Sequence, residues 1–107
     1  MPKYLIVAKY TAKGAEGIVK GGGSARKKVV SEAMEKLGGK LESFYFAMGE
    51  DDAYVIVDAP DNESVIAASI AANAGGGATA KTVVLLTPEE MDAAAKKAEA
   101  SSYTPPK

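Results

Sequence analysis

Three consecutive acidic residues, Glu50, Asp51 and Asp52, form the densest cluster of side chains that could do chemistry. Carboxylate oxygens are the ligands that Mg²⁺ and Ca²⁺ prefer, and carboxylates held close together have raised pKa values that suit acid–base work. This cluster, however, lies between Gly49 and a β-branched run, where an acidic residue commonly accepts hydrogen bonds from the amides of a turn. Three adjacent acids do not form a metal cage by themselves, so we expect a structural turn and no metal site.

A glycine-rich stretch followed by basic residues is the second candidate. Residues 21–24 read Gly-Gly-Gly-Ser and precede Arg26 and Lys27. Free amides at the start of a helix, next to cations, favour a phosphate or a carboxylate. The spacing matches neither a Walker A loop nor the dinucleotide-binding fingerprint. A small anionic ligand therefore stays open as an interpretation, and the alternative is a flexible link before a capped helix.

The composition removes several kinds of catalytic site, because the chain has no histidine, cysteine or tryptophan. It can form no histidine-dependent triad, no thiol nucleophile and no His or Cys metal site. We assign no catalytic residue and expect no cofactor, which leaves open whether the protein is an enzyme.

The charges are unevenly distributed. Residues 1–40 carry nine basic and three acidic side chains, whereas residues 41–107 carry four basic and eleven acidic ones. Such an asymmetry can steer self-association or attract an anionic ligand to the first half. Because the basic residues are not interleaved with aromatic ones, we do not expect a nucleic-acid partner.

The start of the chain runs directly into a strand pattern, without a signal-peptide cleavage pattern. No apolar run is long enough to span a bilayer. We therefore expect a soluble, cytoplasmic protein without a membrane partner. The length predicts one domain, which we place over residues 1–100, with an extended tail over residues 101–107.

Apolar periodicity and turn residues predict the order β-α-β-β-α-β and a further C-terminal helix. The expected strands are residues 3–10, 40–48, 52–58 and 78–86. Residues 11–23 are expected to be a glycine-rich connection, with Ser24 capping the first helix. Asp61 is expected to cap the second helix, and Thr87 the third through a capping box with Glu90. This order predicts an α+β, ferredoxin-like fold, in which two helices lie on one face of a four-stranded antiparallel sheet.

The expected strands carry apolar side chains on both faces. In residues 3–10, for example, Leu5 and Val7 alternate with Ile6 and Ala8. An antiparallel sheet with a solvated face should instead alternate apolar and polar residues. Two helices cover only one face, so the pattern predicts a homodimer in which two sheets meet as a dimeric α+β barrel. The alternative is a monomer whose C-terminal helix folds over the open face.

The sequence resembles the GYD-domain proteins, small proteins of the dimeric α+β barrel superfamily. The matching segments keep their order over most of residues 3–92. They are Tyr-Leu-Ile-Val-Ala-Lys-Tyr-Thr at 4–11, Gly14 and Gly17, Ser-Ala-Arg at 24–26, Leu-Gly-Gly-Lys-Leu at 37–41, Phe-Tyr at 44–45, Gly-Glu at 49–50 with Asp52, the strand and turn at 55–60, and Leu-Thr-Pro-Glu-Glu at 86–90.

The family signature Gly-x-Tyr-Asp is only partly present. Gly49 and Asp52 match it, whereas Asp51 occupies the tyrosine position, and Tyr54 lies two residues beyond Asp52. A ligand contact made by the family tyrosine would therefore be lost here. A similar Gly-x-x-Asp turn occurs in effector-binding domains of the leucine-responsive regulator type, which resemble this fold and bind amino acids between subunits.

The resemblance implies a cavity between helices and sheet, because proteins of this superfamily often hold a small apolar ligand there. On that basis we select four tyrosines as ligand-binding candidates: Tyr4, Tyr10, Tyr45 and Tyr54. Arg26, from the possible anion site at the first helix, and Asp52, from the matched signature, complete the set of six. The alternative for the tyrosines is packing in the core or at an interface, with their hydroxyls bonded at the rim.

Two functions follow as hypotheses. The first is a homo-oligomeric module that binds or senses a small anionic or aromatic molecule. The second is a cofactor-independent enzyme, like the monooxygenases and isomerases of the superfamily, with Tyr, Arg26 or a carboxylate handling protons. A purely structural assembly subunit is a third interpretation.

Overall fold

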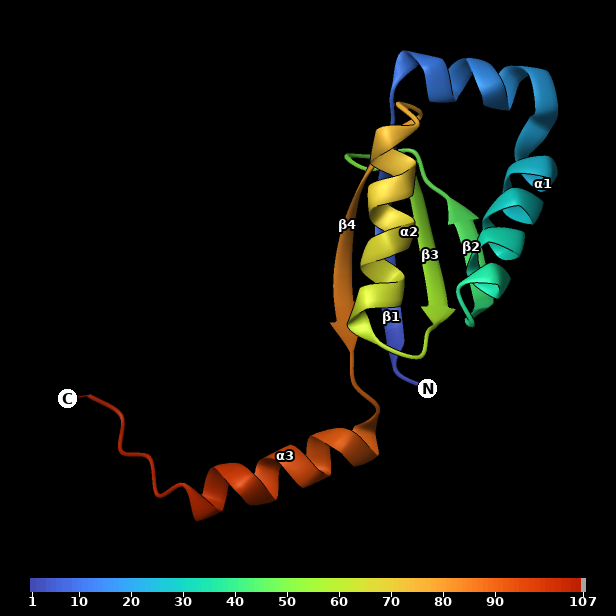
Figure 1. The fold of residues 1–107 in the computed structure, drawn as a ribbon. Helices are drawn as coiled ribbons and strands as arrows, with labels where there is room; N and C mark the ends of the chain where they lie inside the picture. The colour runs from blue at the N-terminus through green and yellow to red at the C-terminus, as the bar shows by residue number, and fades with distance from the viewer. Residues whose placement is uncertain (107) are drawn as a thin grey trace.

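The computed structural model describes residues 1–106 and contains one four-stranded sheet and three helices (Figure 1). The elements follow the chain as β1 (Lys3–Tyr10), α1 (Ala12–Lys36), β2 (Lys40–Phe46), β3 (Ala53–Asp58), α2 (Asn62–Ala74), β4 (Ala78–Leu85) and α3 (Pro88–Ala100). The predicted α+β class and the order β-α-β-β-α-β are confirmed. Residue 107, the last of the expected tail, lies outside the described residues.

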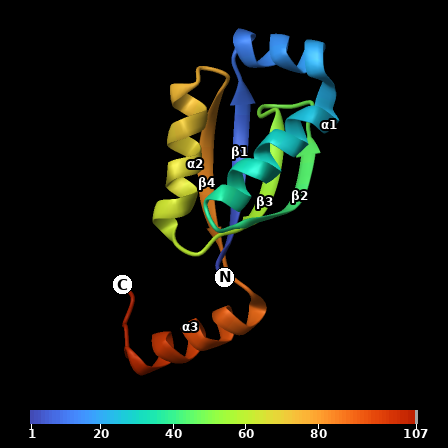
Figure 2. The same cartoon turned by 45° about the vertical axis from the view of Figure 1, so that its right-hand side comes forward.

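The strands pair in the order β2-β3-β1-β4, and all three pairings are antiparallel. Each β-α-β unit therefore has one foreign strand between its own two strands, which is the split arrangement. The register shifts between Leu41 and Ser43, where β2 has a bulge or irregularity. Helices α1 and α2 lie on the same face of the sheet (Figures 1 and 2).

Helix α1 corrects the prediction for residues 11–23, because they form a helix and not a loop. Thr11 is the N-cap, and its side chain accepts a hydrogen bond from the Gly14 amide. Gly22 has a φ of 82°, which glycine adopts readily and other residues rarely do, and it divides α1 into two segments. Ser24 lies two residues beyond this kink, already within the second helical segment and not at its non-helical boundary, so it is not the cap that we expected.

Tertiary contacts hold the first segment of α1 despite its glycines. The Thr11 amide donates to the Gly77 carbonyl at 3.1 Å, and the Thr11 hydroxyl donates to the Gly76 carbonyl at 2.6 Å. Gly14 packs so closely on Gly77 that a Cβ at Gly14 would overlap the Gly77 carbonyl oxygen. The helix start is thereby fixed to the turn before β4, an interaction that local propensity does not reveal.

The other helix ends agree with the sequence. Gly38, at φ 82°, follows the end of α1, and Asp61 and Thr87 cap α2 and α3 as predicted. The Asp61 carboxylate accepts from the Ser64 hydroxyl at 2.7 Å and from the Ser64 amide at 2.9 Å, and these bonds lower the pKa of Asp61. Hydrogen bonds from the Thr87 amide and side chain likewise lower the pKa of Glu90 in the capping box.

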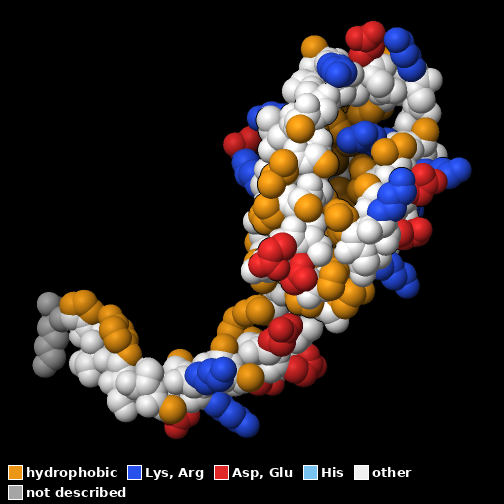
Figure 3. Space-filling model, viewed as in Figure 1, with side chains coloured by type: hydrophobic (Ala, Val, Ile, Leu, Met, Phe, Trp, Pro, Cys, Tyr) orange, Lys and Arg blue, Asp and Glu red, His pale blue; other side chains and the backbone are white. Residues whose placement is uncertain are grey.

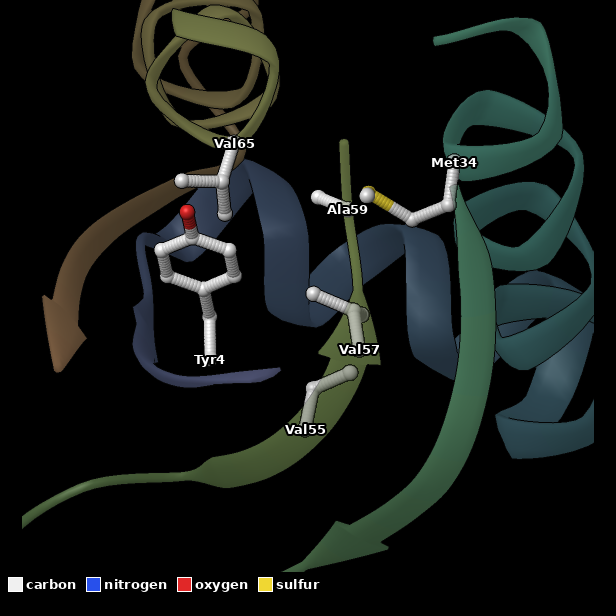
Figure 4. Close-up of a cluster of buried hydrophobic side chains, with 6 residues drawn as sticks. All are labelled: Tyr4, Met34, Val55, Val57, Ala59 and Val65. Carbon is white, nitrogen blue, oxygen red and sulfur yellow. The ribbon is translucent and has the colours of Figure 1, made fainter. Parts of the chain in front are cut away.

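The core lies between the two helices and the end of the sheet where β1 begins (Figure 4). The Tyr4 hydroxyl donates to Asn62 Oδ1 at 2.6 Å, so the buried phenol is satisfied. The buried cluster consists of Tyr4, Met34, Val55, Val57, Ala59 and Val65. Helix α3 contributes nothing to it: none of its residues is buried, and it extends away from the sheet (Figures 1 and 2).

Two glycines of the first α1 segment, Gly14 and Gly17, give a matched test of this packing. A Cβ placed on Gly17 would have no neighbouring atom within 4 Å, so Gly17→Ala should stabilise the helix by about 0.5–1 kcal/mol. Gly14→Ala should destabilise the protein by about 1–3 kcal/mol, because the methyl group would displace the Gly77 backbone. Urea unfolding followed by circular dichroism measures both. Equal stabilisation by the two substitutions would show that the Gly14–Gly77 contact is not tight.

Candidate functional site

A groove of about 460 Å³ lies between α1, α2 and the sheet. It exists because α1 packs mainly against β2 while α2 packs mainly against β4, which leaves the middle of the sheet uncovered between them. Figure 3 shows the corresponding hollow, with hydrophobic side chains inside it. The cavity volume falls within the range of small-molecule sites, which is about 300–1,000 Å³.

Small side chains keep this groove open. The floor carries alanines on β1 and β4, where Ala8 pairs with Ala80 and Tyr10 pairs with Ala78. The α2 wall is made of Ala67, Ala68, Ser69, Ala71 and Ala72. Larger residues line the rest of the surface: Ile6, Val29, Val30, Met34, Leu37, Phe44 and Val55.

Arg26 brings a positive charge into the upper part of this apolar surface. It lies four residues after the Gly22 kink, and its guanidinium carbon is 5.9 Å from the centre of the Tyr10 ring. Tyr10 continues into an aromatic cluster, with ring centres 6.3 Å apart to Phe46 and 5.0 Å apart between Phe46 and Phe44. Arg26 Nε is buried and has no hydrogen-bond partner among residues 1–106.

A second hollow of about 290 Å³ adjoins the groove beneath the first segment of α1. Arg26 and Val29 line both spaces, so the two spaces share a boundary at these side chains. The other residues that line the second hollow are Lys13, Gly14, Gly17, Ile18, Gly21, Gly22, Ala25 and Gly77. The glycines that predicted a loop therefore form one wall of a recess instead.

The polar content of the groove is small. Besides Arg26 and the Tyr10 phenol, it has Lys36 at one end and the Ser69 hydroxyl, which lies 3.1 Å from the Thr82 hydroxyl. Among the described residues, no aspartate or glutamate lines the groove. Within residues 1–106, no group of three or more acidic side chains is placed to hold a metal ion. The arrangement suits binding of an apolar or anionic molecule more than acid–base chemistry.

The structure brings together two of the six residues selected from the sequence, Tyr10 and Arg26. Tyr4 lies in the core on the same face of the sheet, below the groove. Tyr45 and Tyr54 pair with one another across β2 and β3, on the opposite face. The alanine floor and the α2 wall were not selected, because alanine has no chemical signature. Their only signal in the sequence was the abundance of alanine in the expected second helix and at the start of the last strand.

Asp52 forms hydrogen bonds to the backbone of three other residues. Its carboxylate accepts a hydrogen bond from the Tyr10 amide at 2.8 Å, its amide donates to the Ala8 carbonyl at 2.9 Å, and its carbonyl accepts from Ala47 at 2.8 Å. These bonds tie the β2–β3 hairpin to the end of β1. The neighbouring Asp51 lies 4.0 Å from the Lys81 ammonium group. Through the hydrogen bond from the Tyr10 amide, Asp52 holds Tyr10 at the end of the groove.

A scan against family models matches the GYD domain over residues 4–95. The chain belongs to the GYD domain family. The match runs from β1 into α3 and thus includes every element that forms the groove. The split arrangement of the GYD domain is consistent with the ferredoxin-like placement that the sequence indicated. Searches of curated proteins and of solved structures found no match.

Among residues 1–106, no helix combines the length and apolar character needed to span a membrane.

Asp52 is the residue that matched the aspartate of the Gly-x-Tyr-Asp pattern in the sequence. Its observed contacts give this aspartate a structural reason in this chain.

Substitution of Asp52 tests that reason. Asp52→Ala removes a charged acceptor from the Tyr10 amide and should lower the free energy of unfolding by about 1.5–3 kcal/mol. Asp52→Asn keeps an acceptor oxygen and should lose less. Glu50→Ala, at an exposed position of the same turn, should change stability by no more than about 0.5 kcal/mol. Urea titration compares the three variants, and equal losses at positions 50 and 52 would contradict the proposed role.

Proposed function

We propose that this GYD-domain protein is a homodimeric module that binds a small molecule in the groove between α1, α2 and the sheet. The observation that carries the proposal is an apolar groove of about 460 Å³ with a buried, unpartnered Arg26 nitrogen at its wall. Largely apolar pockets with a few polar groups are the usual form of a ligand site.

The second candidate function is that of a cofactor-independent enzyme acting on an aromatic molecule. It is favoured by the Tyr10 phenol, which lies beside Arg26 in the groove. A general base, however, has to reach the proton that it removes, and within residues 1–106 no carboxylate lines the groove. Binding without chemistry is therefore the function that the geometry supports better.

The dimer is proposed from the open face of the sheet. Leu5 pairs with Ile56 on one side and with Val83 on the other, and these side chains lie on the face away from the helices. The same face carries Val7, Tyr45, Tyr54 and Leu85. Tyr45 is 71% exposed, Val83 45% and Tyr54 40%, and exposed apolar patches of this kind usually mark an interface.

Charged residues flank this patch at both ends. At one end Lys3 bonds Glu42 at 2.7 Å and Asp58 at 2.9 Å, and these hydrogen bonds raise the pKa of Lys3. At the other end lie Lys81 and Asp51. An apolar centre with a charged rim is typical of a protein interface. Both signs are present at each end, so a second copy related by a two-fold axis can meet opposite charges.

Helix α3 leaves the patch free for such a partner. The monomeric alternative required the C-terminal helix to fold over the open face, but α3 extends away from the sheet (Figures 1 and 2). The second copy is consequently the proposed cover for this face. The groove lies on the opposite face, so dimerisation and ligand binding would use separate surfaces of each subunit.

A charge in the centre of the patch tests the dimer. Ile56→Lys should raise the dimer dissociation constant by about 100-fold or more, because it would bury an unpaired ammonium group between two sheets. Ile70→Lys is the matched control, since Ile70 is 61% exposed on α2. Native mass spectrometry and light scattering at micromolar concentration measure the subunit number. A wild-type monomer, or a dimer unaffected by Ile56→Lys, would refute this interface.

Filling the groove tests the ligand site. N-phenyl-1-naphthylamine, a neutral aromatic dye that fluoresces in apolar surroundings, should bind the wild-type protein. Ala72→Leu should weaken binding by about tenfold, because the larger side chain occupies part of the groove and leucine is well tolerated in helices. Ala74→Leu, an exposed position of α2 outside the groove, is the control. Equal dye affinity in both variants would place the dye elsewhere and contradict the proposed site.

A further inference from the structure

We infer that the ligand of this groove is an amphipathic monoanion, with an apolar body on the alanine-rich floor and one acidic head group on Arg26. The inference rests on the proposed function and names the chemical class of ligand that this site would take.

The state of Arg26 indicates a missing anionic partner. Its Nε is buried without a hydrogen bond, and none of the four salt bridges formed among residues 1–106 includes Arg26. A buried donor without a partner costs free energy, and more so when it carries charge. The Tyr10 ring offers the guanidinium an aromatic face but accepts no conventional hydrogen bond there. A carboxylate, by contrast, can accept two parallel hydrogen bonds from a guanidinium.

The charges around the two connected spaces have one sign. Their lining includes Lys13, Arg26 and Lys36, but in the part of the chain that the structure describes neither space has an aspartate or a glutamate in its lining. A ligand cation would therefore meet only like charges, whereas an anion would meet no repulsion from the walls. The positive surroundings favour an anionic head group at the boundary that Arg26 forms between the two spaces.

The number and spacing of these cations favour a single negative charge. Lys13 already donates to the Gly75 carbonyl at 3.1 Å. Lys36 follows Arg26 by ten residues on α1, which corresponds to about 15 Å along a helix. Within residues 1–106, Arg26 is thus the one cation placed against the aromatic cluster, whereas a polyphosphate would require several cations around the same head group.

The apolar part of the ligand has a defined course. From Arg26 the second segment of α1 presents Val29, Val30 and Ala33 to the groove, and the α2 wall opposite them is mainly alanine. Tyr10 and Phe44 add aromatic surface to the floor. An aryl or alkyl body can lie along this course while its acidic head stays at Arg26.

A pair of dyes that differ in charge tests the inference. Anilinonaphthalene-8-sulfonate carries the same aromatic system as N-phenyl-1-naphthylamine and adds one sulfonate, so the comparison isolates the head group. Fluorescence titration should show the sulfonate binding wild-type protein about tenfold more tightly than the neutral dye, as expected for a charged hydrogen bond. Arg26→Gln should remove that advantage and change the affinity for the neutral dye by less than about twofold.

Two further variants identify the cause of any change. Lys27→Gln removes a neighbouring exposed charge outside the groove, and it should leave both affinities unchanged. Arg26→Lys keeps the charge but loses the planar guanidinium, and it should retain part of the sulfonate preference. Circular dichroism confirms that each variant is folded; if Arg26→Gln is not, Arg26→Lys and Lys27→Gln still separate a specific contact from general attraction.

The outcomes separate the inference from the proposed function. If neither dye binds, the proposed small-molecule site is wrong, and the inference fails with it. If the neutral dye binds as tightly as the sulfonate, or if Lys27→Gln weakens the sulfonate as much as Arg26→Gln does, the groove is a ligand site but Arg26 is not its anion anchor.

Discussion

The close contact between Gly14 and Gly77 determines how the rest of the molecule is arranged on the helical face. It fixes the first segment of α1 across one end of the sheet, together with the hydrogen bonds from Thr11 to Gly76 and Gly77. The positive φ of Gly22 then allows the chain to turn, and the second segment descends along β2 (Figure 1). Because α1 reaches the sheet from its outer edge, it does not pack broadly on α2. The groove and the position of Arg26 are both consequences of this path.

The sequence predicts best the features that depend on neighbouring residues. Capping residues, glycine helix ends and two-residue periodicity are local, so the element order, the Asp61 and Thr87 caps and the antiparallel class could be recognised without a structure. The helix over residues 12–21 could not be recognised in the same way. Each glycine lowers helix propensity, and the compensating contacts come from residues more than sixty positions away.

The candidate site was predictable only in part, for a related reason. Arg26 and Tyr10 have recognisable chemistry, and the structure places them side by side. Tyr45 and Tyr54 have the same side chain as Tyr10, but the strand register places them on the other face of the sheet. Which face a strand residue occupies relative to the helices is a tertiary property. The volume of the groove depends on alanines, because their small side chains leave the space between the helices and the sheet unfilled.

In this alanine-rich chain both faces of the sheet carry apolar residues, but they differ in what covers them. Alanine on α2, β1 and β4 opens a groove, but it also reduces the apolar surface that the helices bury on that face. The core that remains is confined to a few residues around Tyr4, Met34 and Val57. The open face has Leu5, Ile56 and Val83 at its centre. It offers apolar surface for burial, which the groove, kept open on the helical face, does not. If two sheets pack there, the stability gained between subunits compensates for the space kept free within each one. Among the described residues, none on the open face lines the groove. Dimerisation would therefore affect the groove only by making the sheet that forms the groove floor more rigid.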